Sequence, residues 1–454
     1  MVGTLRSFFI PLVALLLMAA QPALARDEAS AKIFDEAARL VRFNFYDPKM
    51  HGLDWDKTVE RYRPDYLAAT TRQQRADVIN ALLGELKASH MIYATVDDPA
   101  YYQLSDIFRF AIRKEMPKHF PNGISYPGIG VFTREIEGKT FVAGVWPGFA
   151  ADKAGLKTGD EILTVDGAPF EPVASFREKT GKTVTMSIRR TRGGPVSVLD
   201  VRPERIEPGD AFRAAMRNSA RIIDANGKRI GYIRVLSYAG QDYQNILAEE
   251  LSRGKLKDAD ALIWDLRDGW GGARPHFLDI FNARAPDMTF TERGGAPEFV
   301  SFRWRKPVAL LINGGSRSGK EVLAYGFKKY GYGEVIGMRT AGALLAGRGY
   351  LLSDGSFLMV AVNDVAVDGE RLEGQGVTPT IEVPFDLPYS AGADPQLDKA
   401  VEVLLDRMER PERRARRVIV DVTLVERETV ADLTVGKDRS PPVRRREQPQ
   451  PIRV

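Results

Sequence analysis

The feature that most constrains this chain is an alternation of strand and helix patterns between residues 228 and 385. Short apolar runs such as "DALIWDLRD" (260–268) and "PVALLING" (307–314) are typical of buried strands. "RIGYIRVL" (229–236) reads as a further strand, and "YQNILAEELSRG" (243–254) has helical spacing. Alternation of this kind predicts an α/β core with a largely buried sheet, which we place at residues 210–410. Functional groups are then expected in the loops beyond the strand ends.

Two further folded segments precede this core, as expected for a chain of 454 residues. Residues 26–120 are helical in pattern, since "AKIFDEAARLVRFNFY" and "TRQQRADVINALLGELKASH" carry apolar residues at three- and four-residue spacing. Residues 124–205 change to short β-rich runs between glycines. The overall fold class predicted is therefore a multi-domain α/β protein with a helical N-terminal segment.

The β-rich segment resembles a PDZ domain. In "GVWPGFAADKAGLKTGDEILTVDG" (144–167), Gly148, Ala151 and the "AGL" at 154–156 match its short helix and turn, and "GDEILTVDG" matches a strand with its closing turn. "PGIGVF" (127–132) is similar to the family's carboxylate-binding loop, so the resemblance implies a β-barrel at 124–205 in which Gly128, Ile129, Gly130 and Val131 bind a peptide C-terminus. Physically, a strand edge beside such a loop adds an extended peptide by main-chain pairing. A small β-barrel without a peptide role is the alternative.

The two ends of the chain differ from the rest. Residues 1–25 have the pattern of a secretory signal peptide, with Arg6 before the apolar "FFIPLVALLLMAA" and small residues "ALA" (23–25) before the expected cleavage after Ala25. A membrane anchor is the alternative, but the run is short for a span and contains Pro11. Residues 411–454 form a basic extension in which "RRVIVDVTLVERETVADLTV" (416–435) is expected to form a strand pair, and the following "SPPVRRREQPQP" predicts a solvated, disordered tail rather than a nucleic-acid site. We expect an exported, periplasmic or extracellular protein with no stable membrane insertion after cleavage.

The stretch "NGGSRSGKEVLAYG" (313–326) places two serines among glycines before a helical pattern. "SGKE" (318–321) fits a capping box, which is a purely structural explanation for Ser318. A helix start is also a position where N–H dipoles stabilise an oxyanion, so Ser318 is equally a candidate nucleophile. With no cysteine in the chain, thiolate chemistry and disulfides are excluded.

Together with "WDLRDGWGGA" (264–273) and "IGMRTAG" (336–342), the serine stretch resembles the C-terminal processing and tricorn-type serine peptidases. Members of that family pair a strand ending in Asp-Leu-Arg and a double glycine with a later serine-rich helix start, commonly after a PDZ domain. The resemblance covers about residues 50–390. It implies a crotonase/ClpP-like α/β protease core whose backbone N–H groups at Gly271 or Gly272 and at Gly319 bind the oxyanion.

The resemblance also indicates which general base to expect. C-terminal processing peptidases use a lysine, but Ala343 stands at that position here, and Lys320 points to a different face of its helix. The tricorn-type branch uses a histidine carried before the PDZ domain, and "LLGELKASHMIY" (82–93) is similar to its Leu-x-x-Ser-His segment. We therefore expect His90 to be the general base, assisted by Ser89.

A glutamate near the end of the core orients the histidine in that branch. Glu373, in "VDGERLEGQGVTPTIEVP" (367–384), matches this position, and Glu370 is its competitor. Two departures concern the oxyanion loop: Gly269 replaces the usual asparagine, and Trp270 replaces a small residue or proline, which is expected to narrow or block the substrate site.

From these features we predict an exported serine endopeptidase acting on peptide or protein substrates, with PDZ recognition of substrate C-termini and with no metal or organic cofactor. The alternative is a catalytically inactive, PDZ-containing peptide-binding or scaffold protein with a peptidase-like fold.

Overall fold

The structure is a computed structural model that describes residues 31–282, 286–300 and 303–410. The predicted signal peptide and the C-terminal extension, including the strand pair expected at 416–435, lie outside the described residues. No helix over the described ranges is long and apolar enough to cross a membrane.

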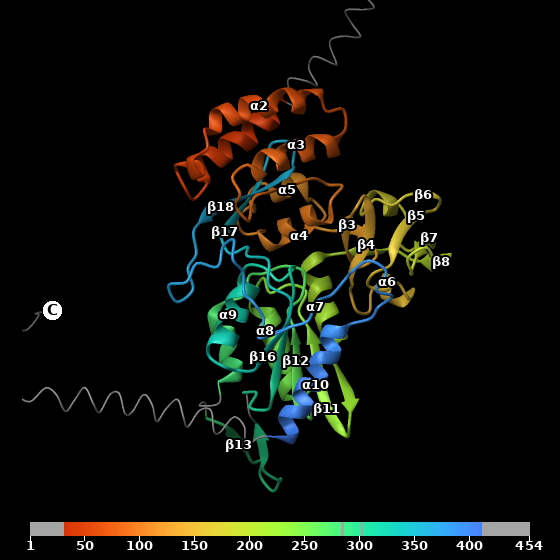
Figure 1. Cartoon of the computed structure of the whole chain (residues 1–454), viewed down its shortest axis with the longest axis vertical. Helices are drawn as coiled ribbons and strands as arrows, with labels where there is room; N and C mark the ends of the chain where they lie inside the picture. The colour runs from red at the N-terminus through yellow and green to blue at the C-terminus, as the bar shows by residue number, and fades with distance from the viewer. Residues whose placement is uncertain (1–30, 283–285, 301–302, 411–454) are drawn as a thin grey trace, which may run out of the picture. The chain divides into compact units, whose positions relative to one another are not determined.

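The N-terminal segment is helical, as predicted. Its helices begin at side chains that satisfy free backbone N–H groups: Asp54 accepts from Lys57, and Thr71 and Gln74 cap each other's backbone in a capping box. The segment consists of a helix over 31–44, η1 (Met50–Gly52), α2 (Trp55–Ala68), α3 (Arg72–Gly84), β1 (Ile92–Ala94), α4 (Pro99–Ile107) and α5 (Met116–His119) (Figure 1).

The β-rich segment forms an antiparallel sheet in the order β3-β4-β5-β7-β8, with β6 paired to β5 and a separate pair β2-β9. Its core is apolar and includes Val142, Ile162 and Met186. The predicted short helix is α6, and the "VDG" turn places Asp166 and Gly167 at positive φ before β6. The elements are β2 (Tyr126–Gly128), β3 (Val131–Ile136), β4 (Lys139–Val145), α6 (Ala150–Lys153), β5 (Glu161–Val165), β6 (Ala168–Pro169), η2 (Ala174–Phe176), β7 (Val184–Arg189), β8 (Val196–Val201) and β9 (Glu204–Ile206).

The predicted α/β core is present as a six-stranded sheet in the order β10-β11-β12-β15-β16-β19. All its pairs are parallel except β10-β11, and every residue of β12 and β15 is buried, which explains their continuous apolar sequences. The elements are α7 (Pro208–Ser219), β10 (Arg221–Ala225), β11 (Lys228–Arg234), α8 (Gln241–Ser252), β12 (Ala261–Asp265), η3 (Pro275–Phe281), β13 (Met288–Phe290), β14 (Glu298–Val300), β15 (Val308–Ile312), α9 (Gly319–Lys329), β16 (Glu334–Gly337), β17 (Ala346–Leu351), β18 (Phe357–Asn363), β19 (Ile381–Glu382) and α10 (Pro395–Glu409).

A second, three-stranded sheet joins the N-terminal segment to the core. In the order β1-β18-β17, β1 pairs antiparallel with β18, so that Ile92 lies opposite Met359 and Ala94 opposite Phe357. Figure 1 shows β17 and β18 next to the N-terminal helices. The helix over 31–44, α2 and α3 share one apolar cluster with Leu358 and Val360 of β18, whereas α4 packs in a second cluster with Phe357 and Met359. This pairing carries the residues just before β1 onto the core.

Candidate active site

His90 lies two residues before β1 and is brought to the core by the β1-β18 pairing. Its φ is 59°, a left-handed conformation that a non-glycine residue adopts at a cost of about 1–3 kcal/mol. The ring packs against β17, because a Cβ atom at Gly347 would lie 3.1 Å from the His90 ring carbon Cδ2. The backbone and the β17 contact together fix where the imidazole points.

A chain of hydrogen bonds links His90 to Glu373 through Ser89. The Ser89 hydroxyl lies 2.8 Å from His90 Nδ1 and donates to Glu373 Oε2 at 2.8 Å. A hydroxyl has one hydrogen and a carboxylate only accepts, so the Nδ1 atom must carry the hydrogen of the His90–Ser89 bond. His90 is thereby held in the tautomer whose Nε2 is free to accept a proton.

Glu373 is fixed by backbone as well as by the hydroxyl. Its carboxylate accepts the N–H of Ser89 at 2.8 Å and the N–H of Leu344 at 2.6 Å. Its sequence competitor Glu370 instead forms a two-residue bridge with Val367 and is exposed. The structure thus brings Glu373, and not Glu370, to Ser89, and the contact to His90 runs through Ser89 rather than directly.

Ser318 ends the loop after β15 and immediately precedes α9, as the capping pattern predicts. Its φ of 56° is again left-handed for a non-glycine residue. Glu321 holds the loop by accepting the N–H of Ser318 at 3.1 Å and that of Ala343 at 2.8 Å, while the Ser318 N–H also donates to the Ala343 carbonyl at 2.9 Å. Ala343, where C-terminal processing peptidases carry lysine, therefore lies directly beside Ser318.

Ser318 and His90 line one cavity of about 470 Å³. Among the described residues, no hydrogen bond joins the Ser318 hydroxyl to the imidazole; catalytic hydrogen bonds commonly tighten only when substrate binds. Apolar side chains also line the cavity: Ile92, Leu104, Ile107, Phe108, Leu345 and Met359. The cavity thus combines a hydroxyl and an imidazole with space for an apolar side chain.

The glycines expected to bind an oxyanion lie beside Ser318. A Cβ atom at Gly271 would be 2.6 Å from the Ser318 Cβ, and one at Gly319 would be 2.2 Å from the Ala273 nitrogen, so only glycine permits this approach. Over the described ranges, the N–H groups of Gly271 and Gly272 donate to no protein acceptor, and both residues line the cavity. Gly319 does not line it.

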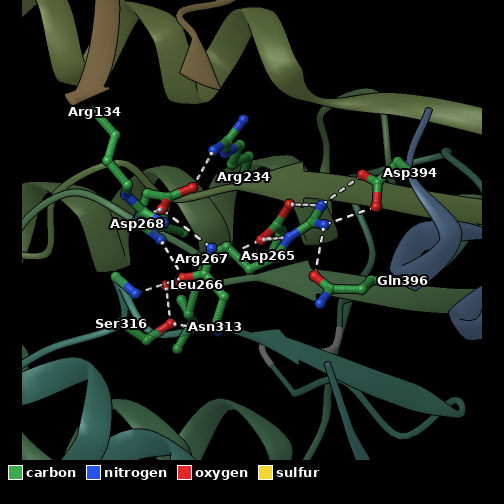
Figure 2. Close-up of polar contacts among 12 residues, drawn as sticks. Arg134, Arg234, Asp265, Leu266, Arg267, Asp268, Asn313, Ser316, Asp394 and Gln396 are labelled. Carbon is green, nitrogen blue, oxygen red and sulfur yellow. Dashed lines mark hydrogen bonds and ion pairs between the residues drawn. The ribbon is translucent and has the colours of Figure 1, made fainter. Parts of the chain in front are cut away.

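Charged groups hold the loop that leads to these glycines (Figure 2). Asp268 accepts from Arg234 at 3.1 Å and from the Asn313 amide at 3.1 Å, and it lies 3.8 Å from Arg134 of β3. Lys320 is fully buried and donates to the carbonyls of Val235 at 2.6 Å and Asp268 at 2.5 Å. Lys320 therefore points away from Ser318, as predicted, and it braces the loop.

Trp270 and Arg317 form a wall between this cavity and a second one of about 300 Å³. The indole N–H donates to Gln103 at 2.7 Å, and the Arg317 guanidinium carbon lies 5.6 Å from the indole ring centre. Trp270 thus bounds the catalytic cavity on one side without filling it. The second cavity is lined from the β-rich segment by the predicted carboxylate loop, Gly128, Ile129, Gly130 and Val131.

Burial dominates the electrostatics of His90. It lowers the pKa of the imidazole from 6.5 to about 4; the charge of Glu373 opposes this shift, and that of Arg317 reinforces it. His90 is therefore neutral at physiological pH and able to accept a proton.

The roles of several residues that shape the site could not be predicted from the sequence, even where the residue belongs to a recognised motif. Arg267, the arginine of the Asp-Leu-Arg motif, binds Asp265 and Asp394 through its forked guanidinium (Figure 2). Asp394 lies 127 residues further along the chain. Glu321 was foreseen only as half of a capping box, and Gln103 not at all.

Three regions of the chain match the models of known protein families. Residues 229–383 match the model of peptidase family S41, residues 27–84 the Tricorn protease C1 domain, and residues 112–189 the PDZ domain. The chain is 28% identical to a putative tricorn protease homolog 2 of Streptomyces coelicolor, over 83% of this chain and 32% of that protein. It is 26% identical to the carboxy-terminal processing protease CtpB of Bacillus subtilis, over 64% of this chain and 62% of that protein. The chain spans about a third of the length of the tricorn homologues it matches.

Solved structures give similar matches. A photosystem II D1 C-terminal processing protease aligns with a TM-score of 0.46 and 21% identity, over 80% of this chain and 98% of that one. The tricorn protease aligns with a TM-score of 0.48 and 20% identity, over 84% of this chain and 37% of that one.

Proposed function

We propose that this chain, which carries a domain of the serine peptidase family S41 together with a Tricorn protease C1 domain and a PDZ domain, is an exported serine endopeptidase. The observation that carries the proposal is the Glu373–Ser89–His90 hydrogen-bond chain, which ends in the cavity that contains Ser318. Three separate parts of the sequence meet there, and the hydrogen bonds among the described residues leave one ring nitrogen of His90 free.

In this proposal Ser318 attacks the carbonyl carbon of the scissile peptide bond. His90 Nε2 takes the hydroxyl proton as the bond forms and then delivers it to the leaving amine, releasing the C-terminal fragment. Water next attacks the acyl-enzyme with His90 again as base, which releases the N-terminal fragment and restores Ser318. Ser89 and Glu373 keep the imidazole in the required tautomer and stabilise its charge when protonated.

In this proposal backbone N–H groups stabilise the negative charge of the tetrahedral intermediate. Gly271 and Gly272 are the first candidates, since their N–H groups are not otherwise used over the described ranges and both line the cavity. Gly319, the first residue of α9, contributes the positive end of the helix dipole. Lys320 holds the loop in place by donating hydrogen bonds to the carbonyls of Val235 and Asp268, so these N–H donors are preorganised.

The PDZ domain supplies the proposed recognition of substrate C-termini through Gly128, Ile129, Gly130 and Val131. Its support is the position of this loop on the cavity that adjoins the catalytic one across Trp270 and Arg317. Export of the chain rests on the signal-like pattern of residues 1–25.

The test is proteolysis by the full chain of an unfolded protein substrate, with products identified by mass spectrometry. We expect internal cleavage by the wild type and none by Ser318→Ala. A wild type that leaves the substrate intact while still binding peptides would refute the peptidase and support the alternative, a peptide-binding scaffold.

A further inference from the structure

Arg317, the residue directly before Ser318, is a part-buried arginine without an acidic partner. Within the part of the chain that the structure describes, its guanidinium makes no hydrogen bond and no ion pair. Its Nε atom is shielded from solvent and unsatisfied. A buried polar group is normally hydrogen-bonded, and each exception calls for an explanation.

The neighbouring arginines differ from Arg317 in having carboxylate partners; Arg234 also has a buried, unsatisfied Nε atom, but its Nη2 atom donates to Asp268. Arg267 binds Asp265 and Asp394, while Arg234 and Arg134 both face Asp268 (Figure 2). Asp268 is therefore already shared by two arginines and an asparagine, and Arg317 has no carboxylate of its own. Burial lowers the pKa of Arg317, with the charges of Asp268 and Glu321 opposing this shift.

The position of Arg317 indicates which part of a bound substrate contacts it. The side chain lines both the catalytic cavity and the cavity of the carboxylate loop, and its guanidinium stacks over Trp270. If substrates run from Ser318 toward the PDZ loop, Arg317 meets the residues on the C-terminal side of the scissile bond. This direction of the substrate rests on the proposed function, whereas the observation that an unpaired guanidinium lines the cavity is independent of it.

We propose that Arg317 binds a carboxylate of the substrate on the leaving-group side of Ser318. The carboxylate belongs either to the end of a short leaving peptide or to an aspartate or glutamate side chain within a longer one. A planar guanidinium binds a carboxylate with two parallel hydrogen bonds, and the aromatic face of Trp270 keeps it in place. The apolar wall of Ile107 and Phe108 then holds a side chain of the same substrate.

The test measures binding without turnover, on the full-length Ser318→Ala variant. Fluorescence anisotropy compares four labelled peptides of one apolar sequence: with a free C-terminus, amidated, amidated with an internal Glu, and amidated with Gln at that position. We expect the free-acid or the Glu peptide to bind about 10- to 100-fold more tightly than its neutral match. The acid–amide pair and the Glu–Gln pair distinguish the two sources of the carboxylate.

The variants assign the preference to Arg317. Arg317→Met/Ser318→Ala should abolish a Glu–Gln difference and should reduce an acid–amide difference to the part that the PDZ loop contributes. Arg317→Lys should keep part of what Arg317→Met loses, since it retains charge without the fork. Arg348→Met is the matched control, because Arg348 also stacks on an aromatic ring, that of Tyr350, but is exposed and lines neither cavity. It should keep the full preference.

Three results would overturn the inference: no acidic preference in Ser318→Ala, a preference that Arg317→Met leaves undiminished, or one that Arg348→Met reduces equally. The second would assign carboxylate binding to the PDZ loop alone, and the third to general electrostatic attraction. A chain that binds carboxylates through Arg317 but never cleaves would refute the proposed peptidase and leave this site intact.

Discussion

Arg267 and Arg317 are two arginines of the same core with opposite surroundings. Arg267 is 8% exposed and makes five hydrogen bonds through its side chain, to Asp265, Asp394 and Gln396. The carboxylates outweigh the effect of burial and raise the pKa of Arg267. The Arg317 side chain makes no such bond to any described residue.

The contrast separates groups that hold the fold from groups that are available to a ligand. Arg267 connects the end of β12 to the start of α10 and is satisfied by the protein alone. The same division runs across the catalytic cavity: Glu373, Ser89 and His90 Nδ1 are paired, whereas the N–H groups of Gly271 and Gly272 are unpaired over the described ranges. Paired groups should therefore affect stability or orientation, and unpaired groups should affect substrate binding.

The largest expected effect follows from removing the base. His90→Ala should lower kcat by about 10⁴-fold, because no other group in the cavity can take the Ser318 proton. The measurement is steady-state peptide hydrolysis. His276→Ala, at an exposed histidine of η3, should remain within a factor of two, and an equal loss in both variants would contradict the assignment.

The next largest expected effect is on stability, because replacing Arg267 and replacing Arg317 should change the free energy of unfolding by different amounts. Arg267→Met leaves Asp265 fully buried without its main partner and should lower the free energy of unfolding by about 3–5 kcal/mol. Arg317→Met breaks no ion pair and should change it by less than about 1 kcal/mol. Denaturant unfolding of both variants makes the comparison, which fails if the two losses are equal.

Weakening the hydrogen-bond chain should have an intermediate effect on catalysis. Glu373→Gln replaces a carboxylate that accepts three hydrogen bonds and should lower kcat by about 10²- to 10³-fold, and Ser89→Ala by about 10- to 100-fold. Stability should change little in comparison. Glu370→Gln is the control on the same loop, and a loss of activity there would favour Glu370 as the functional carboxylate.

The smallest expected effect is the change in kcat/KM with pH. Activity needs neutral His90, so kcat/KM should fall as pH drops through the imidazole pKa, which burial places at about 4. The profile should thus be flat near neutrality. Glu373 raises this pKa, so Glu373→Gln should move the midpoint further down. A rate that still rises well into the alkaline range would point to a lysine base in place of His90 and would contradict the account.

Local patterns predicted the elements well. The apolar runs of β12 and β15, the helix start at Ser318 and the turn at Asp166–Gly167 each depend on residues within a few positions of one another. Such patterns report burial and backbone conformation directly, which explains why they could be interpreted without a structure.

The partners of the site could not be predicted in the same way. Ser89 and Glu373 are 284 residues apart, and the segment that contains Ser89 reaches the core through the pairing of β1 with β18, which no local pattern encodes. Family resemblance pointed to both residues, but not to Ser89 as the bridge between Glu373 and His90. Trp270 was expected to narrow or block the site; its N–H instead bonds to Gln103, and the indole forms one wall of the cavity.

Covalent labelling with a fluorophosphonate probe tests the central claim most directly, because it requires an activated serine but no knowledge of the substrate. The full chain should be modified at Ser318, as located by peptide mass spectrometry. Labelling should vanish in Ser318→Ala, persist in Ser316→Ala, whose hydroxyl only holds the Leu266 carbonyl at 2.9 Å, and slow strongly in His90→Ala. An unlabelled wild type, or a label on another serine, would contradict the account.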